Sequence, residues 1–141
     1  MPGRPSATRR TVLRGAALTP VAGTAAAACS PLGGTTEAAT PTAPVELGSA
    51  SELSPGDARL YRDHNVVVSR AGDGALSAYS SVCTHAGCAI NKLDGEKLIC
   101  PCHGSEFDAA TGEVLRGPAS VGLPKLSVKA ENGKLIAGPG A

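Results

Sequence analysis

The amino-acid sequence predicts a small all-β domain of antiparallel strands that runs from about Val45 to the C-terminus. No helical period of useful length is present, and three Asx-Gly pairs lie between β-prone runs: Asp73-Gly74, Asp94-Gly95 and Asn132-Gly133. An Asx-Gly pair suits the positive φ angles of a type I′ turn, which joins two antiparallel strands. Three hairpins are therefore expected, joining VVVSRAG to ALSAYSS, AINKL to EKLIC, and KLSVKAE to KLIAG.

Composition limits both the size and the class of the protein. With 141 residues and a formal net charge of +1, the chain has room for one domain. This near-neutral net charge excludes a nucleic-acid binder driven by bulk positive charge. Aromatic residues make up only 2% of the chain, so its core needs a covalent or metal staple. Five cysteines are available, and an odd number cannot all pair within one chain.

Residues 1–28 have the layout of a secretory signal peptide, with basic residues first, then a mild apolar run, then small residues. The apolar run is short and interrupted by Pro20, so a membrane-spanning helix is not expected. The alternative is a disordered basic tail. The stretch TRRTVLR, from Thr8 to Arg14 with the pair Arg9 and Arg10, resembles a twin-arginine export signal. That route carries folded proteins and so suits a cofactor inserted in the cytoplasm.

Residues 29–44 are expected to be a solvated tether that begins at a modified cysteine. Ala26-Ala27-Ala28-Cys29 resembles a bacterial lipobox, in which the cysteine becomes the lipidated first residue. Cleavage at an Ala-x-Ala site, leaving Cys29 as a free thiol, is the alternative. Lipidation is favoured because an exposed thiol is a liability outside the cell. The 15 residues from Ser30 to Pro44 are rich in Gly, Thr and Pro and would span roughly 20 Å.

Two similar loops carry the other four cysteines. CTHAGC runs from Cys83 to Cys88 and CPCHGS from Cys100 to Ser105, on either side of the hairpin expected at Asp94-Gly95. Each loop holds two cysteines and one histidine. Two thiolates and two imidazoles are thus available as metal ligands, and one further cysteine remains in each loop.

These loops closely resemble the Rieske iron–sulfur family, which binds a [2Fe–2S] cluster with one Cys and one His from each of two such loops. The resemblance implies that Cys83 and Cys100 bind one iron. His85 and His103 would bind the other iron. It also implies one cluster per chain and a domain, residues 45–141, of small antiparallel sheets with a two-loop cluster-binding subdomain.

Further features of the family can be carried onto this chain. In its disulfide-bearing branch the second cysteines of the loops are bonded to each other, which implies a Cys88–Cys102 disulfide. Gly117-Pro118-Ala119 and Leu123-Pro124 resemble the proline-containing segment that covers the cluster. Ser120 stands where the family usually has a second proline, so a softer lid is expected.

A structural Zn site of Cys and His ligands is the main alternative for the two loops. Zn would explain four ligands but not the two further cysteines placed symmetrically around them. A framework of disulfides alone would leave both histidines unexplained. Outside the loops, His64 lies in a polar turn and is expected to be a solvated loop residue. Tyr61 and Tyr79 lie on strand-like runs and are expected to be core residues rather than electron relays.

Three residues are expected to tune the cluster by analogy with the family: Ser105, Phe107 and Pro118. Ser105 matches the position whose hydroxyl donates to a bridging sulfide. Phe107 stands where high-potential members carry a Tyr that donates to a ligand sulfur, and Phe cannot donate. A hydrogen bond to a charged group contributes roughly 1.5–3 kcal/mol, so the missing donor should lower the potential by roughly 50–100 mV at most.

The ligand set implied by the resemblance suits a one-electron carrier. Two ferric ions, two sulfides and two thiolates carry no net charge, whereas four thiolates would leave the centre negative. A less negative centre accepts an electron more readily, and the added charge beside the imidazoles of His85 and His103 favours proton uptake there.

The expected function is therefore electron transfer in an extracytoplasmic redox chain, by a protein lipid-anchored at the outer face of the cell membrane or in the periplasm. The expected partners are redox proteins or a membrane quinol-oxidising complex. Alternatives are the Rieske subunit of a cytochrome bc-type complex, the small subunit of an exported oxidase, and, in another class, a Zn-stabilised binding module without a redox role. The chain itself is expected to be an electron-transfer component of an oxidoreductase system rather than a stand-alone enzyme.

Overall fold

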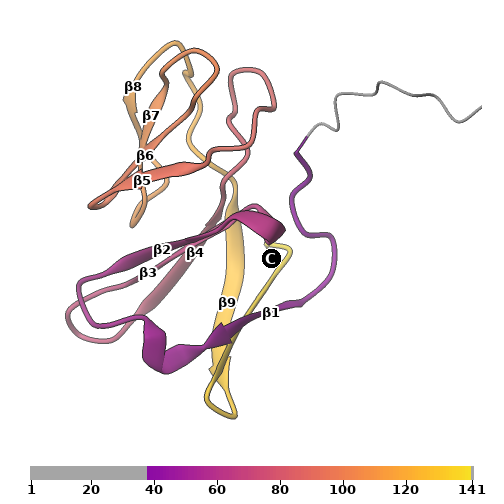
Figure 1. Ribbon diagram of the computed structural model, residues 1–141, viewed down its shortest axis with the longest axis vertical. Helices are drawn as coiled ribbons and strands as arrows, with labels where there is room; N and C mark the ends of the chain where they lie inside the picture. The colour runs from indigo at the N-terminus through magenta and orange to yellow at the C-terminus, as the bar shows by residue number, and fades with distance from the viewer. Residues whose placement is uncertain (1–37, 141) are drawn as a thin grey trace, which may run out of the picture. The chain divides into compact units, whose positions relative to one another are not determined.

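Ten strands form two antiparallel sheets in the part of the chain that the computed structural model describes, residues 38–140 (Figure 1). The fold confirms the predicted all-β class. The predictions made for the export signal, for Cys29 and for the start of the tether fall outside the described residues.

The larger sheet has six strands in the order β1-β10-β9-β4-β3-β2. Every neighbouring pair in it is antiparallel. The short 3₁₀ helices η1 (Ala50–Glu52) and η2 (Arg62–His64) flank β2 in the chain. The strands are β1 (Val45–Ser49), β2 (Ala58–Tyr61), β3 (Val66–Arg70), β4 (Leu76–Ser80), β9 (Lys125–Glu131) and β10 (Lys134–Gly138).

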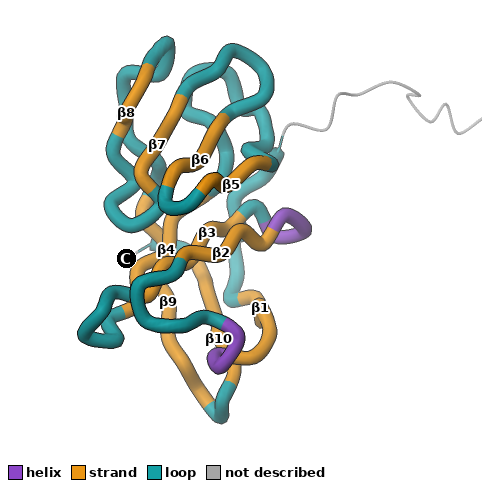
Figure 2. The backbone as a smooth tube through the Cα atoms, turned by 60° about the vertical axis from the view of Figure 1, so that its left-hand side comes forward, coloured by secondary structure: helices purple, strands orange, loops and turns teal. Residues whose placement is uncertain are grey.

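The smaller sheet has four strands in chain order and is inserted between β4 and β9. Figure 2 shows its strands gathered above β2, β3 and β4 of the larger sheet, with loops at their tips. Both cysteine loops belong to this insertion, so the larger sheet acts as a platform for the candidate site. The strands are β5 (Lys92–Asp94), β6 (Lys97–Ile99), β7 (Glu106–Asp108) and β8 (Val114–Arg116).

All three predicted hairpins form, but only one has the predicted turn. Asn132 and Gly133 have φ angles of 51° and 76° and separate the paired residues Glu131 and Lys134, as a type I′ turn requires.

The turns of the other two hairpins differ from the expectation. In the β5–β6 hairpin Asp94 is itself paired with Lys97, so the turn residues are Gly95 and Glu96. The β3–β4 connection is a five-residue loop, in which the side chain of Asp73 accepts a hydrogen bond from the Ala75 N–H. Asx-Gly thus located each hairpin without specifying its turn.

Strand β3 contributes to two hydrophobic clusters because alternate residues of a strand face opposite sides of the sheet. Val66 and Val68 pack with Leu126 and Leu135 on one face. Val67 packs with the smaller sheet on the other face. In the second cluster it joins Tyr79, Ile90, Leu98, Phe107, Leu123 and the two cysteines Cys83 and Cys100. The candidate site is therefore rooted in the core that joins the two sheets.

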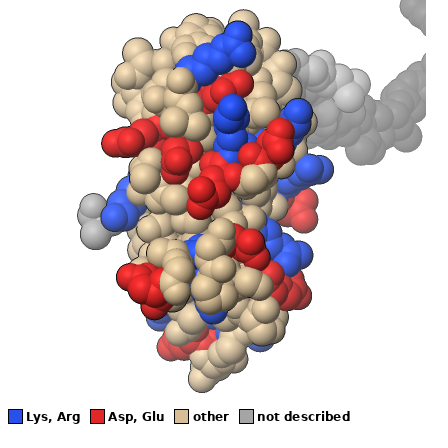
Figure 3. Space-filling view, turned by 90° about the vertical axis from the view of Figure 1, so that its left-hand side faces the viewer, with Lys and Arg blue, Asp and Glu red and all other residues tan. Residues whose placement is uncertain are grey.

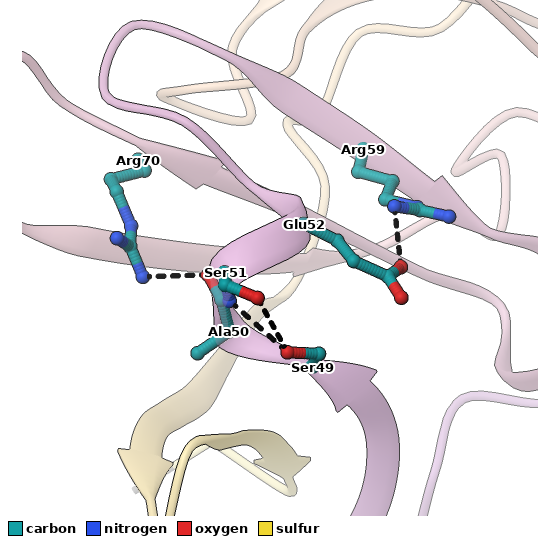
Figure 4. A network of polar contacts seen from close by, with 6 residues as sticks. All are labelled: Ser49, Ala50, Ser51, Glu52, Arg59 and Arg70. Atoms are coloured by element: carbon teal, nitrogen blue, oxygen red, sulfur yellow. Dashed lines mark hydrogen bonds and ion pairs between the residues drawn. The ribbon is translucent and has the colours of Figure 1, made fainter.

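Helix η1 is tied to the platform by polar contacts (Figure 4). The guanidinium of Arg70 donates to the Ala50 carbonyl at 3.1 Å, and Arg59 pairs with Glu52 at 2.7 Å. The Ser49 hydroxyl accepts from the Ser51 N–H at 3.3 Å. These contacts hold the β1–β2 connection against β2 and β3, far along the chain from the cysteine loops.

The last residues of the predicted tether contact the platform. The side-chain amide of Asn65 donates to the Ala39 carbonyl at 3.0 Å, and the hydroxyls of Thr40 and Ser80 are 2.7 Å apart. Ser80 ends β4, three residues before Cys83. Ordered contacts thus begin before Val45 and lie next to the root of the first cysteine loop.

Between residues 38 and 140, no helix is long and apolar enough to cross a membrane. Figure 3 shows basic and acidic side chains interspersed over one face of this region, without a broad area of a single sign. The carboxylate of Glu106 lies 3.3 Å from the Lys97 ammonium and 3.7 Å from the Arg116 guanidinium.

Candidate metal centre

The two cysteine loops share one backbone turn. The N–H of Cys83 donates to the carbonyl of Cys88 at 2.8 Å, and the N–H of Cys100 donates to the carbonyl of Ser105 at 2.9 Å. In each loop the residue four positions after the first cysteine donates back to that cysteine's carbonyl. These residues are Gly87 and Gly104, with φ angles of 72° and 73°. The two loops therefore follow the same backbone path from the first cysteine to the glycine.

The two loop histidines meet at the exposed end of the site. Their Nδ1 atoms are 3.2 Å apart, and their rings stand nearly perpendicular, at 83°. Two nitrogens bound tetrahedrally to one metal ion at about 2.0–2.1 Å would lie about 3.3–3.4 Å apart. His85 and His103 therefore present two nitrogens at the spacing that one shared metal ion requires, while their rings remain exposed to solvent.

The two free thiols lie deeper. Cys83 and Cys100 are each 2% exposed and pack in the core between the sheets. Burial raises the pKa of the Cys100 thiol, the backbone N–H of Cys102 lowers it, and the adjacent Cys83 thiol raises it again. Two buried thiols in contact are thus poorly placed to ionise alone. A metal ion between them would stabilise both as thiolates.

The thiol pair and the imidazole pair do not converge on one point. Four tetrahedral ligands of a single Zn ion would lie within about 3.3–3.8 Å of one another. Within the described residues, the only cluster of three or more potential ligands mutually within 4.8 Å consists of Cys88, Cys100 and Cys102. A mononuclear site holding both thiols and both imidazoles is therefore incompatible with this arrangement. A binuclear group, with one metal ion at each pair, fits the donors.

A disulfide joins the two loops beside this donor set. Cys88 and Cys102 are bonded, with their Cα atoms 6.6 Å apart and a sequence separation of 14. Two of the three clustered sulfurs are therefore unavailable as ligands. Of the five cysteines, only Cys83 and Cys100 are free thiols among the described residues.

The segment from Gly117 to Pro124 covers the loops and is bonded to both. The Thr84 hydroxyl of the first loop donates to the Val121 carbonyl at 2.6 Å. The Ala119 N–H donates to the Ser105 hydroxyl of the second loop at 3.0 Å. Behind these contacts, the Leu123 N–H donates to the Gly112 carbonyl and the Ser80 N–H to the Pro124 carbonyl. The lid is thus anchored at four points.

The residues expected to tune the cluster occupy different layers of the site. Ser105 and Phe107 are fully buried, and Phe107 packs in the same cluster as Cys83 and Cys100. Because the Ser105 oxygen accepts from Ala119, its own proton remains free to donate into the site. Pro118 is exposed and follows a cis peptide bond.

Sequence reasoning missed the glycines and Thr84. Gly87 and Gly104 each stand four residues after the first cysteine of their loop, and that shared spacing was the available signal. Thr84 gave no signal, since its partner Val121 is 37 residues away. Tyr79 is a core residue as expected, packed against Gly112. His64 ends η2, half-buried and outside the loops.

Comparisons with known proteins agree with this geometry. The sequence model of the Rieske [2Fe–2S] domain matches residues 43–127. The cytochrome b6-f complex iron-sulfur subunit of Chlorobaculum thiosulfatiphilum is 37% identical over 93 residues, covering 64% of this chain and 50% of that subunit. The chain thus spans about half the length of this relative.

Solved structures share the fold. The plasma membrane Rieske protein PetC3 of Synechocystis is 36% identical, with a TM-score of 0.52 over 66% of this chain and 97% of that chain. The ferredoxin of carbazole 1,9a-dioxygenase from Nocardioides aromaticivorans is 26% identical, with a TM-score of 0.51 over 70% of this chain and 100% of that chain. The family model covers most of the described residues, and the two loops present a thiol pair and an imidazole pair. This chain therefore belongs to the Rieske [2Fe–2S] domain family.

Proposed function

We propose that this protein is a one-electron carrier in which Cys83 and Cys100 hold one iron of a [2Fe–2S] cluster and His85 and His103 hold the other. The observation that carries the proposal is the split donor set, with two buried thiols in contact and two exposed imidazoles whose Nδ1 atoms are 3.2 Å apart. When bound, a cluster with these donors accepts and releases one electron.

The residues around the donors suit that role. Cys83 and Cys100 are shielded by the core, so the sulfur side of the centre is kept from water. His85 and His103 are exposed, so their ring edges are the part of the site that a redox partner can approach. Val121 on the lid is 65% exposed and Leu115 on β8 is 53% exposed, so apolar surface is also available to a partner.

Substitution of the proposed ligands tests the proposal. Cys100→Ser and His103→Gln should each abolish the visible absorption and the paramagnetic resonance signal of a reduced Rieske centre, because a lost ligand leaves an iron incompletely bound. His64→Gln is the matched control, since His64 lies outside both loops, and it should keep both signals. A normal Rieske signal in Cys100→Ser, or Zn alone in metal analysis of anaerobically prepared protein, would contradict the proposal.

We propose that the electron partner is a redox protein or a quinol-oxidising complex in a membrane. Support comes from the similarity to a cytochrome b6-f complex iron-sulfur subunit. A role as an oxygenase ferredoxin is less well supported, because the ferredoxin of carbazole 1,9a-dioxygenase is only 26% identical to this chain, against 37% for the b6-f subunit. The test is reduction of the oxidised protein by quinol in the presence and absence of membranes. Equal rates in both would argue against a membrane complex as donor.

We propose further that the chain is exported by its twin-arginine segment and anchored by lipid at Cys29, so that residues 45–141 work at the outer face of the cell membrane or in the periplasm. The support is the order of basic, apolar and small residues in 1–28 and the lipobox-like end of that segment. Lys in place of both Arg9 and Arg10 should retain the protein in the cytoplasm, and Cys29→Ala should release it from membranes. A Cys29→Ala protein that still sediments with membranes would contradict the anchor.

A further inference from the structure

A third sulfur lies beside the disulfide that joins the two loops. The Sγ atoms of Cys88, Cys100 and Cys102 are all within 4.8 Å of one another, while Cys88 and Cys102 are bonded to each other. Cys100 is a free thiol, 2% exposed. Cys83, the other free thiol, is not part of this group. Only Cys100 is therefore close to both sulfurs of the disulfide.

We propose that Cys100 exchanges with this disulfide whenever the cluster is absent. The thiolate form of Cys100 attacks Cys88 Sγ, the Cys88–Cys102 bond breaks, and a Cys88–Cys100 bond forms. Cys102 leaves as the thiol and takes up the proton that Cys100 gives up. One disulfide replaces another, so the exchange needs no oxidant or reductant.

The structure favours attack on Cys88 over attack on Cys102. A Cys100–Cys102 bond would close a small ring across Pro101, whose ring restricts the backbone between the two cysteines. The Cys88–Cys100 product keeps the two loops joined, as the native disulfide does. Cys102 is also exposed, so its released thiol enters water, whereas Cys100 gives up a buried thiol.

The exchange matters because it consumes a proposed cluster ligand, and this step of the inference rests on the proposed function. A sulfur bound to iron has committed the electron pair that would attack the disulfide. The cluster would thus protect Cys88–Cys102, and its loss would convert the site into a form with one ligand blocked. Reloading would then require either the reverse exchange, in which Cys102 attacks Cys88, or prior reduction, so cluster loss would slow the binding of a new cluster.

Two single variants of the full chain form a matched test, because each lacks one of the two free thiols. Both are incubated anaerobically without reductant, blocked with N-ethylmaleimide and digested with trypsin. The label is then located by fragmentation in peptides 71–92 and 98–116; Cys29 falls in a different peptide. Cys83→Ser retains Cys100. In this variant the N-ethylmaleimide label should be found on Cys102 instead of Cys100 after the incubation. Cys100→Ser retains Cys83 and should keep Cys88–Cys102 with the label on Cys83.

The wild-type protein supplies the second measurement. In cluster-loaded protein the labelled positions should not change over the whole incubation. In protein stripped of its cluster by a chelator, the label should be found on Cys102 instead of Cys100. The rate of the disulfide exchange should not change on tenfold dilution, since the attack is intramolecular. Persistence of Cys88–Cys102 in both stripped wild type and Cys83→Ser would overturn the inference, as would equal exchange in Cys100→Ser. A wild type that never binds iron would defeat the proposed function but leave the comparison of the two variants intact.

Discussion

Ser105 and Phe107 are the residues at which we expect a single side chain to set the potential of this centre. Both are fully buried on the second loop and the strand that follows it. The Ser105 oxygen already accepts the Ala119 N–H, so its hydroxyl proton can only be used elsewhere. Phe107 packs beside Cys83 and Cys100, the proposed ligands, but has no polar atom to offer. One residue can donate to the cluster, and its neighbour two positions on cannot.

Removing one donor and adding another should shift the midpoint potential in opposite directions. Ser105→Ala should lower it, and Phe107→Tyr should raise it, each on the order of tens of millivolts. The reason is that the extra electron makes the cluster sulfurs better acceptors, so a donor stabilises the reduced form. Potentiometric titration followed by paramagnetic resonance measures both shifts.

Ser120→Ala is the control for this pair, since Ser120 is an exposed hydroxyl on the same lid and should leave the potential unchanged. Phe107→Tyr adds an oxygen to a fully buried position, and an unpaired buried hydroxyl costs about 1–3 kcal/mol. A lower midpoint in Phe107→Tyr with an unchanged resonance spectrum would show that its hydroxyl does not reach a cluster sulfur.

At the scale of the element, the cluster loops depend on a backbone conformation that glycine adopts without strain. Gly104→Ala should lower the free energy of unfolding by about 1 kcal/mol, because its φ of 73° lies in the left-handed region, which costs other residues about 1–2 kcal/mol. No atom lies within 4 Å of the added Cβ, so the cost is one of backbone conformation alone.

Gly72→Ala is the matched control for Gly104→Ala. An added Cβ at Gly72 also meets no atom within 4 Å, but its φ does not lie in the left-handed region. Chemical denaturation of both variants, loaded with cluster, separates the cost of the left-handed φ at position 104 from the general effect of replacing a glycine by alanine. Equal stability of the two variants would show that the loop relaxes to accept an ordinary residue at position 104.

At the scale of the whole molecule, one covalent bond connects the two loops over a span of 14 residues. Replacing Cys88 and Cys102 together by Ser should destabilise the protein by about 2–4 kcal/mol, because closing a loop of this length restricts the unfolded chain. The cluster should still form, since neither residue belongs to the proposed donor set, but it should be lost faster. Absorbance decay in the presence of a chelator measures the loss. An unchanged decay rate would mean that the lid bonds alone close the site.

The predictions from sequence succeeded where the signal was local. The three Asx-Gly pairs each located a hairpin, because a turn is decided by residues next to one another. The type of turn was predicted wrongly at Asp94-Gly95, where pairing of Asp94 with Lys97 moves the turn by one residue. Strand register, which depends on partners across the sheet, overrode the local preference there.

The sequence by itself determined the all-β class, the positions of the hairpins and the two loops whose residues resemble those of the Rieske family, because each of these is written in neighbouring residues. The resemblance implied which donors pair, and the tertiary structure alone decided how the two pairs are placed in space. The approach of His85 to His103, the burial of two thiols apart from them and the bond from Ala119 to Ser105 all join residues distant in sequence. Such contacts follow from how two sheets pack around a shared core, and no local pattern encodes that packing.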